Sequence, residues 1–329
     1  MSAREHAIAA LYGLAIGDAL GMPTQQMSRA EIAGRYGVID GFRAADPGHP
    51  LAGGLPAGHI TDDTEQALLL ADLLIAGRGT VDPGAFAAAL VAWEDDMRER
   101  GSLDLLGPST KRAVRAVLDG EPIATAGRFG TTNGAAMRVT PVGIIRTWQP
   151  VDTLVDLVAS TSLVSHNTGV AIAGASAVAA AISAGIDGAD LGEAFDTAIE
   201  AARLGASRGY WVAAADVSAR IRLAIDLADP ADPHGSLTRL YEVIGTSLAT
   251  QESVPAAFGI LATFPHDPWR AVCAAASLGG DSDTVAAMAG AIGGAVSGST
   301  AFPAEARETV RAVNSLDLES VADGLLALR

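Results

Sequence analysis

The 329-residue chain has little cysteine, few aromatic residues and a shortage of positive charge. The single cysteine, Cys273, permits no intramolecular disulfide framework and fits a reducing compartment, so we expect a cytoplasmic protein. The 22 basic residues are outnumbered by 38 acidic ones, which gives a net charge of −16, and no large Lys/Arg cluster occurs. Because nucleic acids and anionic membrane surfaces are bound through basic patches, we expect neither as a partner.

Export signals and membrane spans are lacking as well. The N-terminus carries Glu5 and His6 and shows no charged-then-apolar leader pattern, so no export is indicated. Two long uncharged runs, residues 169–186 and 284–303, are rich in Ala, Gly and Ser and poor in Leu and Phe. Close-packed helices inside a soluble bundle explain these runs better than lipid-facing spans do.

Apolar residues recur at three- and four-residue spacing through most of the chain, a pattern typical of helices, while alternating strand patterns are scarce. We therefore predict an all-α fold, a compact orthogonal helical bundle in which residues 1–329 form a single domain. The stretches 37–62 and 120–140 are predicted to be loops that shape a cleft. The predicted helices cover residues 3–20, 64–76, 83–98, 109–118, 151–163, 169–184, 191–204, 213–227, 236–248, 255–264, 269–276, 285–296, 304–313 and 318–328.

Glycines recur every fourth residue along one face of the first predicted helix, at Gly13, Gly17 and Gly21. Because a helical glycine costs stability relative to alanine, these positions predict the close approach of another backbone. An ordinary tight contact between two helices explains them without any ligand. Asp18 lies among them, and a carboxylate on such a crowded face needs a partner.

Two acidic clusters stand at the starts of predicted helices: "TDDT" contains Asp62 and Asp63, and "DSDT" contains Asp281 and Asp283. Each acid pair has a simple explanation as a helix cap, and Glu65 completes a capping-box pattern after Asp62. Capping needs only one acid at each place, however. Four acids brought together would repel one another unless a cation neutralised them, so we expect the two helix starts to meet at a cation site.

Carboxylate and hydroxyl oxygens from the two clusters suit Mg²⁺, Mn²⁺ or Ca²⁺, whereas the lack of a His/Cys cluster speaks against zinc. Two ions roughly 3.5–4 Å apart would be bridged naturally by such a donor set. The candidate metal ligands are Thr61, Asp62, Asp63, Asp281, Asp283 and Thr284.

Five motifs occur in the order and spacing of the ADP-ribosylglycohydrolase family, which the chain resembles over about residues 8–298. They are "GLAIGDALGMP", "TDDT", "TNGAAMR", "SHNTGVAIAGA" and "GGDSDTVAAMAGAIGGA". The family includes the dinitrogenase-reductase-activating glycohydrolase and the ADP-ribosyl-acceptor hydrolases. The resemblance implies a helical bundle of that type with two Mg²⁺ or Mn²⁺ ions. It also implies hydrolysis at the anomeric carbon of a ribosyl group, with ADP-ribosylated proteins or small ribosyl and nucleotide compounds as substrates.

The same resemblance implies roles for individual residues. The six Asp and Thr residues look like the metal ligands, and Asp62, Asp63 and Asp283 are the expected catalytic acids. "TNGAAMR" resembles a loop that contacts ribose and phosphates, "LLGPST" resembles a further substrate loop, and His166 matches a position near the nucleotide end of the ligand. The expected substrate-binding residues are Gln25, Gly107, Ser109, Thr110, Asn133, Gly134, Ala135, Met137, Arg138 and His166.

One position departs from the family pattern. Two residues after the proline of "GDALGMP" the family usually has a glutamate, and Gln25 stands there in this chain. An amide offers a carbonyl oxygen but takes no proton. The base would then be a metal-bound hydroxide assisted by an aspartate, or the substrate would differ from protein-linked ADP-ribose. Nucleosides and small ribosyl conjugates are the alternative substrates, because they require the same bond to be broken.

The sequence leaves other functions of the protein, and other roles for single residues, open. Gln25 favours a non-catalytic nucleotide-binding protein, and the intact acids of both motifs argue against one. A metal-dependent phosphoester hydrolase fits the acids but not the order of the glycine-rich loops. Single residues have alternatives too: His166 as a polar residue at a helix start, Arg138 as a surface cation, and Asp104 as a solvated loop residue instead of a second acid near the substrate.

Overall fold

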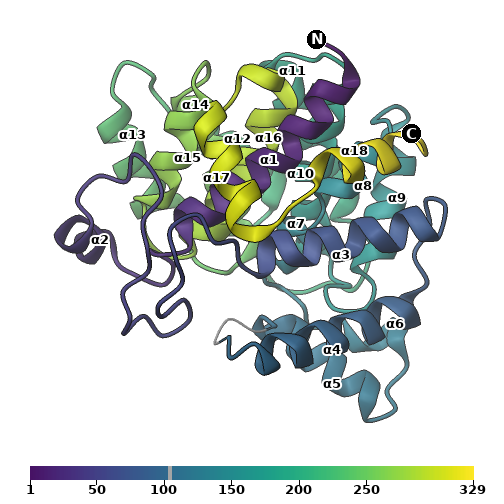
Figure 1. The fold of residues 1–329 in the computed structure, drawn as a ribbon. Helices are drawn as coiled ribbons and strands as arrows, with labels where there is room; N and C mark the ends of the chain where they lie inside the picture. The colour runs from purple at the N-terminus through teal and green to yellow at the C-terminus, as the bar shows by residue number, and fades with distance from the viewer. Residues whose placement is uncertain (103–105) are drawn as a thin grey trace.

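The architecture, in a computed structural model that describes residues 1–102 and 106–329, consists of helices joined by loops (Figure 1). Helices make up 65% of the chain, and the described residues form no β-strand, only isolated bridges. The all-α prediction is therefore confirmed. Asp104, for which two interpretations were open, lies outside the described residues.

The helices follow the predicted order closely, with several short additions. They are α1 (Ala3–Gly21), α2 (Arg29–Arg35), α3 (Asp62–Ala76), α4 (Pro83–Glu99), α5 (Pro108–Leu118), α6 (Ile123–Ala126), α7 (Gly134–Met137), α8 (Thr140–Ile145), α9 (Val151–Ser162), α10 (Gly169–Ile186), α11 (Leu191–Gly205), α12 (Val217–Asp226), α13 (Pro233–Arg239), the π-turn η1 (Leu240–Ile244), α14 (Thr250–Thr263), α15 (Pro268–Ala276), α16 (Ser282–Ser297), the 3₁₀ turn η2 (Gly298–Thr300), α17 (Ala304–Asn314) and α18 (Leu318–Leu326).

Several predicted boundaries are wrong, each for a local reason. Helix α14 begins at Thr250, five residues before the predicted start at residue 255, and contains Pro255 in its interior. Helix α12 begins at Val217, because the Asp216 side chain accepts the backbone N–H of Ala219 and so caps the helix there.

Four short helices were not predicted: α2, α6, α7 and α8. Helix α2 has a complete capping box, in which Ser28 accepts from the backbone of Glu31 and the Glu31 carboxylate accepts from Ser28. The sequence therefore carried a signal for this helix. Helices α6 and α7 fall within the predicted loop 120–140, and each has only four residues. A helix of that length is too short to show a helical apolar period in the sequence.

Helix α10 is the centre of the bundle. It is long and apolar enough to cross a membrane by composition, yet every one of its residues is buried. Helices α1, α8, α9, α11, α14 and α16 pack around it. Its small Ala, Gly and Ser side chains allow this close packing on all sides, as was expected for residues 169–186.

Helices α1 and α16 pack with their backbones in contact. A Cβ on Gly13 would lie 2.0 Å from the carbonyl oxygen of Gly290, and a Cβ on Gly17 would lie 2.0 Å from that of Ala286. A Cβ on Gly21 would lie 2.3 Å from the Cα of Asp283. The glycine face of the first helix thus has the predicted purpose, because no other residue allows this approach.

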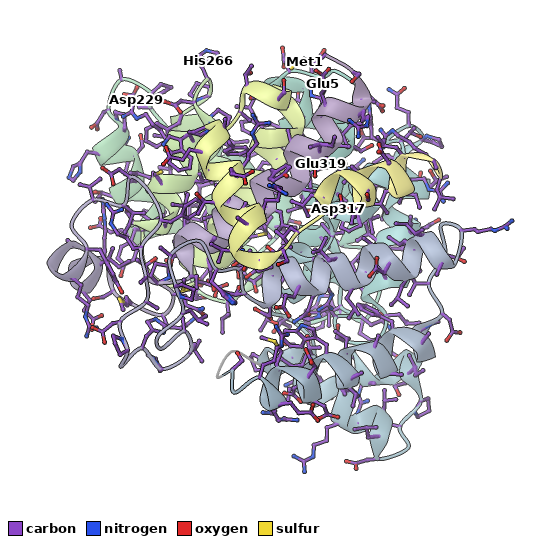
Figure 2. The ribbon with its side chains drawn as sticks, viewed as in Figure 1. Met1, Glu5, Asp229, His266, Asp317 and Glu319 are labelled. Carbon is purple, nitrogen blue, oxygen red and sulfur yellow. The ribbon has the colours of Figure 1, made fainter. Side chains whose placement is uncertain are left out.

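The C-terminal helices hold the opposite side of α1. The Arg4 guanidinium pairs with Asp323 at 2.7 Å, and the Tyr12 hydroxyl donates to Glu319 at 2.9 Å. Figure 2 shows Glu319 and Asp317 at the start of α18, beside α1. Helix α1 is therefore enclosed between α16 and the α17–α18 pair, which fixes the position of Asp18 within it.

The glycine contact gives a stability prediction. Gly17→Ala should lower the free energy of unfolding by about 3 kcal/mol or more, because its methyl group meets backbone that cannot move aside. Gly34→Ala in α2 is the matched control, since a Cβ there meets nothing within 4 Å. The control should gain up to about 1 kcal/mol from helix propensity. Equal urea-unfolding midpoints for both variants would contradict the contact.

Candidate metal and substrate site

Asp18, from α1, closes the N-terminus of α3. Its carboxylate accepts the backbone N–H groups of Thr61 at 3.0 Å and Thr64 at 3.1 Å. It also accepts the hydroxyl of Thr61 at 2.7 Å and that of Thr64 at 2.5 Å. The cap of α3 therefore comes from another helix. The N–H and hydroxyl groups at the start of α3 are the partners that the Asp18 carboxylate needs. Asp62 is the first helical residue, so its interpretation as the N-cap is wrong.

The second acidic cluster stands at the start of α16. Asp281 is the N-cap residue, but its side chain makes no capping hydrogen bond to the first turn of α16. Its carboxylate instead accepts the amide of Asn133 at 2.5 Å and that of Gln26 at 3.5 Å. Gly280 allows the turn before it, with φ +75, and the Asp281 N–H donates to Thr246 at 2.7 Å. Capping therefore explains neither acid pair.

The two helix starts meet, as predicted. The Thr284 hydroxyl donates to Asp63 Oδ2 at 3.2 Å, which joins α16 to α3. Burial raises the pKa of Asp63 well above its usual value, and the nearby charge of Asp283 raises that pKa further. Burial also raises the pKa of Asp281 to about 6. The cluster is thus an arrangement of buried carboxyl groups that ionise with difficulty.

The donor set fits a hard cation, although the described parts of the chain hold no ready-made group of three Asp, Glu, His or Cys side chains around one point. Asp63 Oδ1 is buried and accepts no hydrogen bond from the described residues. A buried carboxylate oxygen without a donor is costly unless something positive lies against it. Carboxylate and threonine oxygens in such a setting match the ligands that Mg²⁺ and Mn²⁺ prefer.

A cavity of about 520 Å³ lies against the acids, a size that suits a small-molecule ligand. The acidic wall of this cavity consists of Asp62, Asp281, Asp283 and Thr284. The start of α5, the loop that enters α7 and the turn after α1 supply most of the remaining lining. Residues from these three segments that line the cavity are Gly107, Pro108, Thr110, Lys111, Thr132, Asn133, Gly134, Met137, Gln25 and Gln26.

Six of the ten predicted substrate-binding residues line this cavity: Gln25, Gly107, Thr110, Asn133, Gly134 and Met137. Lining residues that the prediction missed include Thr132, the first residue of "TNGAAMR", and Lys111, which follows "LLGPST". Leu51 and Leu248 come from loops without a motif. Backbone pairing explains the position of Leu248, because the N–H of Asn133 donates to the carbonyl of Leu248 at 2.9 Å.

Four predicted substrate-binding residues do not line the cavity: Ser109, Ala135, Arg138 and His166. All four are buried. Arg138 is only 2% exposed, so its interpretation as a surface cation is wrong, and its guanidinium lies over the Phe86 ring at 5.4 Å. The metal-ligand candidates Thr61 and Asp63 are likewise absent from the cavity lining and lie behind it.

His166 is held in one protonation state behind the cavity. Its Nδ1 faces the Arg138 guanidinium at 3.3 Å, and since a guanidinium only donates, Nδ1 accepts. The ring proton is therefore on Nε2, which donates to the Thr132 hydroxyl oxygen at 2.9 Å. Burial and the charge of Arg138 lower the pKa of His166 well below its usual value. The ring is neutral and supports Thr132.

Comparison with known proteins agrees with this geometry. The family profile described as ADP-ribosylglycohydrolase matches residues 1–329. The chain belongs to this family. The uncharacterized protein YegU of Escherichia coli is 36% identical over 326 residues, covering 99% of this chain and 97% of that protein. An ADP-ribosylarginine hydrolase of Pseudomonas putida is 30% identical over 324 residues, covering 94% of this chain and 75% of that protein.

A solved structure of an ADP-ribosylglycohydrolase-related protein complex has the same fold, with a TM-score of 0.73, 25% identity and 99% of each chain covered. The family and these relatives support a glycohydrolase activity of the ADP-ribosyl-hydrolase type. The acidic cluster and the cavity therefore belong to an ADP-ribosylglycohydrolase fold.

The acidic cluster predicts an unusual pH dependence of stability without metal. Because the pKa of Asp281 is raised to about 6, the folded protein takes up this proton at a higher pH than the unfolded chain does. Stability is then greatest near the ordinary aspartate pKa and falls as pH rises through about 6. The change due to Asp281 is on the order of 3 kcal/mol.

Urea unfolding in EDTA at about pH 5 and about pH 8 captures about half of this change, roughly 1.4 kcal/mol, because the fall in stability begins near pH 4. Asp281→Asn should flatten the dependence, because the amide does not titrate. Asp156→Asn, at an exposed acid on α9, is the matched control and should leave it as in the parent. The same pH dependence in all three proteins would contradict the raised pKa of Asp281.

Proposed function

We propose that this ADP-ribosylglycohydrolase is a metal-dependent enzyme that hydrolyses the glycosidic bond at the anomeric carbon of an ADP-ribosyl group. The observation that carries the proposal is the meeting of two Asp/Thr helix starts at one wall of the 520 Å³ cavity. Burial of several carboxyl groups at a cavity is costly, and such a cost is typical of functional sites.

Two Mg²⁺ or Mn²⁺ ions would be held by the six Asp and Thr residues of the two helix starts. When bound, such ions polarise substrate oxygens and make a water molecule a better nucleophile at neutral pH. Asp18 prepares Thr61 for this role, because the Thr61 hydroxyl proton is donated to Asp18. The lone pairs of that oxygen are then left for a cation.

The aspartates of the cavity wall have two further tasks. Hydrolysis at an anomeric carbon passes through a state with positive charge on the sugar ring, which nearby carboxylates stabilise. Asp62 and Asp283 line the cavity and are placed to accept the proton of the attacking water. Leu106, Met137 and Leu248 supply apolar lining that excludes other water from the bond.

The part of the cavity lined by α5 favours a substrate with phosphate groups. The start of α5 lies in the wall, and its N-cap residue, Gly107, has no side chain that could accept the first N–H groups of the helix. Backbone N–H groups at a helix start bind anions, and the neighbouring Lys111 adds a positive charge. A cavity lined by both the acids and this helix start suits ADP-ribose conjugates, including ADP-ribosylarginine as in the Pseudomonas relative's name.

A second candidate substrate class is supported by Gln25. Its amide nitrogen is buried at the cavity and has no hydrogen-bond partner among the described residues. An amide N–H in that place is able to donate to a ligand hydroxyl, which favours nucleosides or small ribosyl conjugates. If the protein were a non-catalytic nucleotide-binding member, the buried acids at the cavity would have no function. Their costly burial there argues against this alternative.

Metal dependence is tested by Asp283→Ala. This variant should lose Mn²⁺ and Mg²⁺ affinity in calorimetry, because one carboxylate of the donor set is removed. Turnover of ADP-ribosylated substrates should fall by roughly 10²–10⁴-fold. Asp156→Ala, at an exposed acid, is the control and should bind metal as the parent does. Unchanged metal affinity in Asp283→Ala would rule out the ligand assignment.

The substrate class is tested by Gln25→Glu on a panel of ADP-ribosylated peptides, ADP-ribose esters and nucleosides. If the reaction uses protein-linked ADP-ribose, the added carboxylate should raise turnover, because it supplies a proton acceptor at the cavity. If Gln25 instead binds a smaller ribosyl compound, turnover of that compound should fall. A single catalytic group is worth roughly 10²–10⁴-fold, so either change is measurable.

We favour the second outcome, since the buried Gln25 amide nitrogen lacks a protein partner. Gln149→Glu makes the same chemical change at an exposed position and serves as the control. Rates for Gln25→Glu equal to the parent across the whole panel would place Gln25 outside the chemistry.

A further inference from the structure

Arg138 is the meeting point of two hydrogen-bonded chains that end at two residues of the cavity lining, Asp62 and Thr132. The first chain leads to the acids. Arg138 Nη1 donates to Gln66 Oε1 at 2.8 Å, and Gln66 Nε2 donates to Asp62 Oδ2 at 2.8 Å. The amide of Gln66 thus has its oxygen on the cation and its nitrogen on the carboxylate, so its orientation is fixed by both neighbours.

The second chain leads to the wall beside α7. Arg138 Nη2 donates to Ser165 Oγ at 2.5 Å, and Ser165 in turn lies 2.8 Å from His166 Nδ1. Since Nδ1 accepts, Ser165 is the donor. His166 Nε2 then donates to Thr132 at 2.9 Å. The Thr132 oxygen is occupied as an acceptor, which directs its own O–H away from His166.

The charge of Arg138 is buried without a direct ion pair. Arg138 is 2% exposed, and Gln66, Ser165 and His166 are 0% exposed. None of the ion pairs found in the described ranges, 1–102 and 106–329, involves Arg138. Burial lowers the pKa of Arg138 to about 10, and the charge of Asp62 opposes this shift. A buried cation of this kind needs compensation, and Asp62 supplies it through Gln66.

We propose that Arg138 and Gln66 are positioning residues that hold Asp62 in its working orientation at the cavity, while Arg138 also holds Thr132 at a second point of the lining. The inference rests on the proposed glycohydrolase function. One oxygen of Asp62 is committed to Gln66, so the carboxylate does not rotate to follow its ligand. Neither Arg138 nor Gln66 lines the cavity, so both act through the residues that do.

Gln66→Glu is the decisive variant, because it keeps the size of the side chain and strengthens the pairing with Arg138. It removes the N–H that Asp62 accepts and sets two carboxylates against each other. We expect an unchanged or raised melting temperature, a 10–100-fold loss of kcat, and a similar loss of Mn²⁺ affinity in calorimetry, the usual effect of losing a supporting hydrogen bond. The KM for the substrate should change much less than kcat.

A double-mutant cycle separates positioning from general damage to the fold. Added to Asp62→Asn, Gln66→Glu should cause less than a twofold further loss of kcat and of Mn²⁺ affinity, because its effect passes through Asp62. Arg138→Lys keeps the charge but loses the planar fork, so it should reproduce the loss in the parent background. Gln149→Glu is the matched control and should behave as the parent.

Two results would overturn the proposal. Gln66→Glu with kcat and Mn²⁺ affinity within twofold of the parent would show that Asp62 needs no support. Equal losses in the parent and Asp62→Asn backgrounds would show a merely structural role. A parent that binds Mn²⁺ but hydrolyses no ADP-ribosylated substrate would instead count against the proposed function, and the metal affinities of the cycle would still decide the positioning role. A parent protein that neither binds Mn²⁺ nor hydrolyses an ADP-ribosylated substrate would rule out both the proposed function and the positioning role.

Discussion

The site depends on the contact between the backbones of α1 and α16. Gly17 and Gly21 have no side chains to keep the helices apart, so the start of α16 lies directly on α1, with Asp283 against Gly21. Asp18, between these glycines, then reaches the start of α3 and takes its N–H groups. One helix contact therefore places both acidic clusters, although they come from opposite ends of the chain.

The acids are arranged at the expense of stability. Burial raises the pKa values of Asp18, Asp63 and Asp281, and the neighbouring charges add to this shift at Asp63. A fold selected only for stability would place apolar residues or a single cap there. The surrounding helices, rich in small side chains and largely buried, provide the packing that offsets this cost.

Local patterns in the sequence were sufficient for most helices and for the acidic clusters. Periodicity, caps and the glycine spacing act over a few residues, so they are visible without a structure. Pro255 was misread, because a proline tolerated inside α14 looks the same in sequence as one at a helix start. Leu51 reaches the cavity from the loop 37–62, which was expected to shape a cleft. Leu248 is placed by a backbone hydrogen bond with the distant Asn133, and no local signal predicts this contact.

Arg138 shows why a charged residue in a ligand-binding motif need not touch the ligand. The motif places Arg138 one residue after α7, where the chain turns inward, and its guanidinium ends between Gln66 and Ser165. Asp18 has the corresponding place on the other side of the acids, where it orients Thr61 and Thr64. Two buried groups of opposite charge thus hold the start of α3 from both sides. The cap of α3 comes from α1, and the first carboxylate of α3, Asp62, is oriented through Gln66. The oxygens at this helix start are therefore arranged before any ligand arrives, which allows binding without a large reorganisation.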